Sequence, residues 1–162
     1  MRDRLELAVP GAVVGAVGGL VAGVLAAVVG QPYAWAATVS LGLAVPLGVF
    51  GGVLGLLLGS GRVRMGVFAP VALFWLVGFP LARLVGEVFT GAVLGGRVLP
   101  DDVVGFLAYQ GIVSFGWSLG FLWLHERIAP HWLDRVRSGN PLAQRWFERY
   151  AAHARVLRAA RR

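Results

Sequence analysis

Two opposite charges lie four residues apart in an otherwise apolar stretch of the chain. Arg83 and Glu87 both fall within residues 67–94, and side chains four apart share one face of a helix. A charge inside a membrane is costly unless it is paired or faces other helices. We therefore expect an ion pair between Arg83 and Glu87. From their depths along neighbouring helices, Tyr109 and Gln110 are predicted to join this pair as a polar cluster in the outer half of a helical bundle.

Three roles are open for this predicted cluster. The pair can be structural, with side chains that reach the outer membrane interface and end the helix near Phe89 or Thr90. It can bind a ligand, an ion or a proton, as intramembrane charges do in transport proteins. It can also form a buried contact with a partner subunit. Pro80 precedes the pair and, lacking an N–H, is expected to kink the helix there.

Other chemistry is scarce. His125-Glu126 begins like a zinc-protease motif, but Ala129 stands where the second histidine belongs. His131 is six residues from His125, so the two do not share a helical face. The chain has no cysteine, which excludes thiolate chemistry and cysteine-ligated metals. The sequence therefore predicts no catalytic residue, no metal site and no cofactor.

The elements that position these residues are four long apolar runs. Of the 162 residues, 57% are hydrophobic and 14% are charged. Each run can cross a hydrocarbon core of about 30 Å as a helix, and none alternates as barrel strands do. The sequence predicts an all-α integral membrane domain over residues 1–128, a bundle of four transmembrane helices, followed by a cytoplasmic tail over residues 129–162. The predicted helices cover residues 7–29, 34–58, 67–94 and 103–124.

Arginine placement predicts the orientation. Every basic residue is arginine, and these residues gather before the first run, in the gap 59–64 and in the tail. Positive segments remain on the cytoplasmic side, so both ends are expected there. The protein is expected to be multi-pass in a cell membrane, and the composition favours a bacterial cytoplasmic membrane. Cleavage of the first run as a signal peptide, after residues 34–36, is the alternative.

Glycines at four-residue spacing predict close helix packing, a glycine zipper. Lipid gives helices no hydrophobic reason to associate, so close backbone approach must supply the contact. Three interpretations are open: packing of the first two helices, an interface between copies, or a glycine-lined path. Residues 8–23 also resemble residues 44–59, which a shared packing solution explains; an inverted pair of the kind seen in transporters is the alternative. The helix-packing glycines are Gly11, Gly15, Gly19, Gly23, Gly51, Gly55 and Gly59.

The sequence of the tail predicts a basic amphipathic helix, with Asn140 as its cap and Pro141 in its first turn. Such a helix beside a membrane lies in the interface and is attracted to anionic lipid. Docking to a protein partner is the alternative, and nucleic acid is not expected because lipid better explains the aromatic residues. The predicted membrane-surface residues are Arg145, Trp146, Phe147, Arg149, Tyr150, Arg155 and Arg158.

These features favour a small structural, accessory or assembly protein, which packs as a homo-oligomer or with other membrane proteins and is not an enzyme. The alternative is a small oligomeric transporter or channel that uses Arg83 and Glu87. An enzyme acting on lipid or isoprenoid ranks third, because such enzymes usually carry several carboxylates or histidines near the bilayer surface.

Overall fold

The regular structure in the described part of the chain is entirely helical. The computed structural model describes the backbone of residues 1–159 and the side chains of residues 1–155. Four of the five helices, α1 to α4, are long and apolar enough to cross a membrane, which confirms the four predicted long apolar helices as candidate spans. The fifth is a shorter C-terminal helix. The helices are α1 (Arg2–Val28), α2 (Tyr33–Gly59), α3 (Phe68–Leu94), α4 (Val103–Val136) and α5 (Pro141–Ala159).

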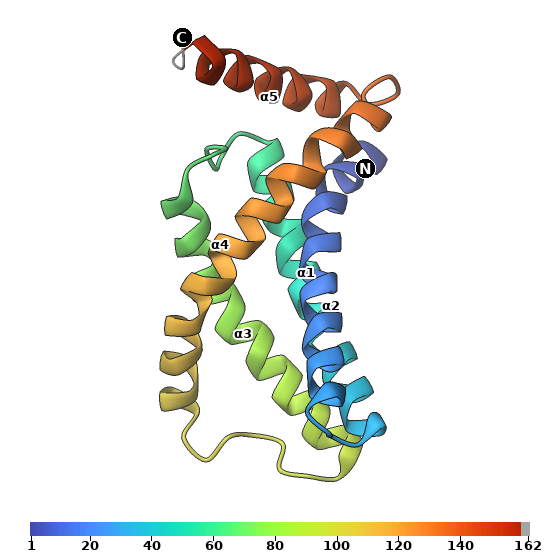
Figure 1. The fold of residues 1–162 in the computed structure, drawn as a ribbon, viewed down its shortest axis with the longest axis vertical. Helices are drawn as coiled ribbons and strands as arrows, with labels where there is room; N and C mark the ends of the chain where they lie inside the picture. The colour runs from blue at the N-terminus through green and yellow to red at the C-terminus, as the bar shows by residue number, and fades with distance from the viewer. Residues whose placement is uncertain (160–162) are drawn as a thin grey trace.

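The four long helices form an elongated bundle, and α5 lies across one end of it (Figure 1). The N-terminus and the connection between α2 and α3 lie at this same end. We call it the arginine-rich end, because it contains residues 1–6, residues 60–67 and α5. The turn between α1 and α2 and the longer connection over residues 95–102 lie at the opposite end. The arginine-rich segments and the connection over residues 95–102 thus lie at opposite ends of the bundle.

The helices α1 and α2 meet backbone to backbone. A Cβ added to Gly15 would overlap the backbone carbonyl of Leu47, and one added to Gly11 would overlap that of Gly51. The reverse contact is equally close, because a Cβ on Gly51 would overlap the carbonyl of Gly11. Such an approach lets main-chain atoms of two helices pack without intervening side chains. The stripe continues in Gly19 and Gly23, which face α2, and in Gly55 and Gly59, which face Leu7.

Large aromatic side chains fill the wider space where α2, α3 and α4 meet. Trp75 is fully buried, and its ring centroid lies 5.4 Å from that of Trp117 and 4.9 Å from that of Phe121. Phe74 and Phe50 extend the cluster toward α2, with centroids 6.3 Å apart. Edge-to-face aromatic pairs stabilise a core beyond the area they bury. The bundle therefore combines a backbone-to-backbone contact between α1 and α2 with an aromatic core among α2, α3 and α4.

The helix α4 continues well past residue 124, where the predicted span ends. It runs without interruption to Val136 and includes Pro130. Its extension is helical because His125, Ala129 and Leu133, spaced by four, are all buried on one face. The Trp132 indole also donates a hydrogen bond of 2.8 Å to the Glu6 carbonyl of α1. The tail therefore begins as part of a transmembrane helix.

We expect Gly15→Ala to destabilise the fold by about 1–3 kcal/mol, the usual effect of overpacking a close contact. The added methyl group has no room beside the α2 backbone. Gly111→Ala in α4 is the matched control, because its Cβ would meet only the Leu76 side chain, at an ordinary contact distance of 3.6 Å. Thermal unfolding of both variants in the same detergent measures the difference. Equal stability of the two variants would contradict the backbone contact.

Candidate functional site

The charged residues of α3 form an ion pair with each other. The Arg83 guanidinium donates a hydrogen bond of 2.9 Å to the Glu87 carboxylate, one helical turn away. Arg83 is 25% exposed and Glu87 is 42% exposed, so the pair lies at the edge of the bundle rather than in its core. Side chains four residues apart are neighbours on a helix surface, so opposite charges at this spacing stabilise the helix.

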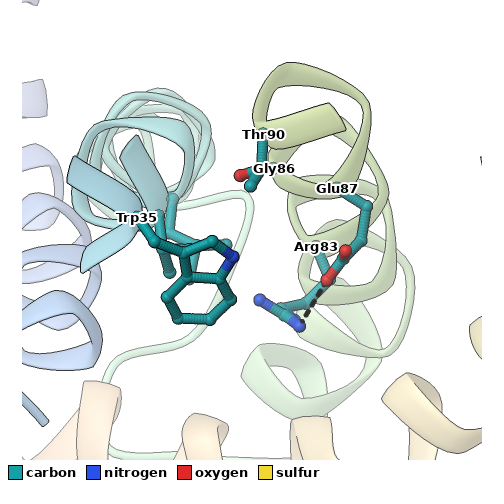
Figure 2. A pocket seen from close by; sticks show the side chains of 7 residues that line it. Trp35, Arg83, Gly86, Glu87 and Thr90 are labelled. Carbon is teal, nitrogen blue, oxygen red and sulfur yellow. Dashed lines mark hydrogen bonds and ion pairs between the residues drawn. The ribbon is translucent and has the colours of Figure 1, made fainter. Parts of the chain in front are cut away.

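The pair lies beside a small pocket between α2 and α3, about 100 Å³ in volume. Figure 2 shows the Trp35 indole of α2 facing the Arg83 guanidinium across this space. Glu87 is the only hydrogen-bond partner of Arg83 within the described residues. The other guanidinium N–H groups are therefore available to whatever occupies the pocket. The remaining lining residues are Val39, Leu43, Gly86 and Thr90.

The predicted partners from α4 do not join the pair. Tyr109 is 63% exposed, and neither Tyr109 nor Gln110 lines the pocket, although Gln110 is buried. The prediction rested on equal depth alone, and depth does not fix which helices are neighbours. At the end of the bundle opposite the arginine-rich end, Figure 1 shows the end of α3 beside the start of α2. The helix α4 begins farther away, at the other side of the connection over residues 95–102. Arg83 therefore faces α2.

The pocket can do limited chemistry. Its volume suits a few water molecules or a small anion. A more open hollow of about 350 Å³ toward α1 shares Trp35, Val39, Leu43 and Arg83 with it. The two buried serines of α4 form hydrogen bonds with their own helix. Ser114 donates to the Gly111 carbonyl and Ser118 to the Ser114 carbonyl, both at 2.6 Å.

A second polar region lies at the arginine-rich end, where α5 docks on the bundle through Trp146. Trp146 is fully buried, and its indole N–H lies 2.9 Å from the Met65 sulfur. Arg149 donates to the Gly59 carbonyl at the end of α2. Burial, together with the nearby Glu126 charge, raises the pKa of Tyr150, so its phenol remains neutral at physiological pH. The described part of α5 is thus fastened to the spans.

Asn140 fixes the start of α5 and confirms the predicted cap. Its side-chain oxygen accepts hydrogen bonds from the backbone of Leu142 and Ala143, at 2.9 and 3.1 Å. Its amide nitrogen donates to the Asp3 carbonyl and to the Glu6 carboxylate, both at 2.9 Å. Asn140 is 1% exposed, so its side chain is shielded from water. One side chain therefore joins α5 to the N-terminal turn of α1.

The predicted membrane-surface residues differ in their exposure. Trp146 lies in the protein core rather than at a lipid surface, because the ends of α2 and α4 cover it. Phe147, Arg149 and Tyr150 are half-buried. The exposed members are Arg145 and Arg155, whereas the side chain of Arg158 lies outside the described residues.

Sequence reasoning missed His125 as the link between the core and α5. Its ring stacks on Phe121 at 5.7 Å and on Trp146 at 6.1 Å between centroids. It is fully buried, and neither ring nitrogen has a hydrogen-bond partner among the described residues. The available signal was the spacing of Trp117, Phe121 and His125, each four residues apart on one helical face. No group of three potential metal ligands occurs in the described chain.

Arg83→Leu is expected to destabilise the fold, because it leaves the Glu87 carboxylate without its cation. The double variant Arg83→Leu/Glu87→Leu should recover most of this loss. We expect a coupling of roughly 0.5–1.5 kcal/mol, the range found for polar contacts within membranes. Denaturant titration of the wild-type chain, Arg83→Leu, Glu87→Leu and the double variant in one detergent measures it. Additive effects would show that the pair contributes nothing.

Asn140→Ala should loosen α5 by about 1 kcal/mol through loss of the helix cap, and further through the lost bonds to α1. Hydrogen exchange of the α5 amides measures this local opening. Gln144→Ala is the control, because Gln144 is exposed and its side chain bonds only to Glu148 within α5. Equal exchange in both variants would contradict the role of Asn140.

Comparisons with known proteins identify no family for this chain. No protein-family model matches it, no curated protein matches its sequence, and no solved structure matches its fold.

Proposed function

We propose that this chain is a non-catalytic accessory or assembly protein, which packs with itself or with another membrane protein. The observation that carries the proposal is the docking of α5, in which Trp146 is buried while Arg145 and Arg155 are exposed. A helix fixed in advance loses less conformational entropy when a partner binds. A docked helix with outward charges suits recognition of another protein at the membrane surface.

The arginine-rich end indicates how the protein is oriented in the membrane. Positively charged segments of membrane proteins stay on the cytoplasmic side, and residues 1–6, residues 60–67 and α5 share one end of the bundle. We infer that this end faces the cytoplasm of a bacterial cell. The proposed partner then meets α5 from the cytoplasmic side.

The surface of α4 supports association within the membrane. Gly116 and Gly120 are four apart and exposed, and a Cβ added to either would meet no atom within 4 Å. The glycines of α1 and α2 already face each other, so they offer less free surface. Exposed small residues let another helix approach closely, with Leu119 and Trp123 beside them.

A small oligomeric transporter or channel is the second candidate. The pocket beside Arg83 favours it, because free guanidinium N–H groups at this position could contact a small anion. Anion flux into proteoliposomes that Arg83→Leu abolishes would support this function. Equal flux with the wild-type chain, the variant and empty vesicles would contradict it.

Affinity purification in native-lipid particles, followed by mass determination, tests the accessory role. We expect a stoichiometric second protein or a defined homo-oligomer. Trp146→Ala should reduce this association, because it removes the side chain that fastens α5. Trp35→Ala, at the opposite end of the bundle, is the matched control and should leave the association unchanged.

Two results would contradict the accessory role. The first is a lone wild-type chain across several extraction conditions. The second is undiminished association of Trp146→Ala in particles where hydrogen exchange shows that α5 has been released.

A further inference from the structure

A hollow of about 450 Å³ opens at the arginine-rich end, between the start of α1, the end of α2 and the start of α5. It is distinct from the pocket beside Arg83, which lies toward the other end of the bundle and shares no lining residue with it. Two arginines and four leucines line it, together with Gly59 and Ser60. The arginines are Arg4 and Arg62, and the leucines are Leu7, Leu56, Leu57 and Leu142.

The two arginines supply uncompensated positive charge. Neither Arg4 nor Arg62 forms an ion pair or a side-chain hydrogen bond within the described residues. By contrast, Arg2 pairs with Glu6 at 3.0 Å and Arg137 with Asp134 at 2.9 Å. The lining of the hollow includes no carboxylate. An anion therefore meets two cations there and no opposing charge.

The backbone beneath Arg62 is fixed. The Arg62 N–H donates to the Leu57 carbonyl at 3.0 Å, and the Gly61 N–H donates to the Leu58 carbonyl at 3.1 Å. Gly61 has a φ of +78°, the left-handed conformation that ends a helix in this way. Arg62 therefore leaves the end of α2 in a set direction, and its position does not depend on a mobile loop.

The leucines identify the kind of anion. Leu7 is buried, and Leu56, Leu57 and Leu142 are half-buried around the hollow. A soluble phosphate gains nothing from such a wall, whereas the acyl chains of a lipid bury apolar area against it. The hollow also lies where α1 and α2 leave the span, the depth at which lipid headgroups lie. Basic pockets between helices at this depth suit anionic headgroups.

We propose that this hollow binds the headgroup of one anionic glycerophospholipid. Arg4 contacts its phosphate from α1 and Arg62 from the connection that follows α2, and its acyl chains run along the leucines. Such a lipid would bridge α1, α2 and α5, because Leu142 belongs to the first turn of α5. This site differs from a diffuse attraction of the exposed α5 arginines to the membrane surface.

Native mass spectrometry of the purified full chain tests the site, with phosphatidylglycerol and phosphatidylcholine added separately as probes. We expect one phosphatidylglycerol to be retained in preference to phosphatidylcholine. Arg4→Gln/Arg62→Gln should weaken retention by about tenfold or more, because two arginines are lost from one phosphate. Arg145→Gln/Arg155→Gln is the control, since it changes the net charge equally on the exposed face of α5.

Three outcomes would overturn the proposal. Equal loss in both double variants would mean that net charge alone attracts lipid. Unchanged retention in Arg4→Gln/Arg62→Gln would place the lipid elsewhere. Displacement of phosphatidylglycerol by inorganic phosphate at a similar concentration would identify a soluble anion as the ligand. These results are independent of whether a protein partner copurifies, so the accessory role and the lipid site are tested separately.

Discussion

The close approach of α1 and α2 is the constraint on which the rest of the structure depends. Lipid surrounds the spans, so helices gain little by hiding apolar surface from one another. Contact must come from main-chain atoms, and Gly11, Gly15 and Gly51 permit it by lacking a Cβ. Once this pair is set, its glycine-rich faces leave few large side chains between the two helices. The bulky residues therefore gather on α3 and α4, which pack against the pair.

The aromatic core makes α5 a continuation of the bundle rather than an appendage. Ring contacts run from Trp75 through Phe121 and His125 to Trp146 without a break. The first three belong to long helices that carry apolar spans, and Trp146 belongs to α5. Burying a tryptophan supplies far more stabilisation than a surface ion pair. The exposed arginines can therefore serve recognition, while the core holds the helix that carries them.

Local sequence patterns predicted the features that local physics controls. The four spans follow from hydrophobicity, the start of α5 from Asn140, and the Arg83–Glu87 pair from helical spacing. Features that depend on how helices cross were not predictable in this way. Arg83 faces α2 because α3 and α4 diverge at that end, and Trp146 faces protein because α4 extends beneath α5. An amphipathic face indicates that something apolar covers it, and gives no means to distinguish lipid from protein.

The bonds from Asn140 to Asp3 and Glu6 have a consequence for how the protein is made. They join residues that the ribosome produces 137 and 134 positions apart. Chains generally emerge and fold from the N-terminal side first, so Asp3 and Glu6 wait for this partner until every span has been delivered to the bilayer. The contact between α5 and the N-terminal turn can therefore form only after all four long helices have been synthesised.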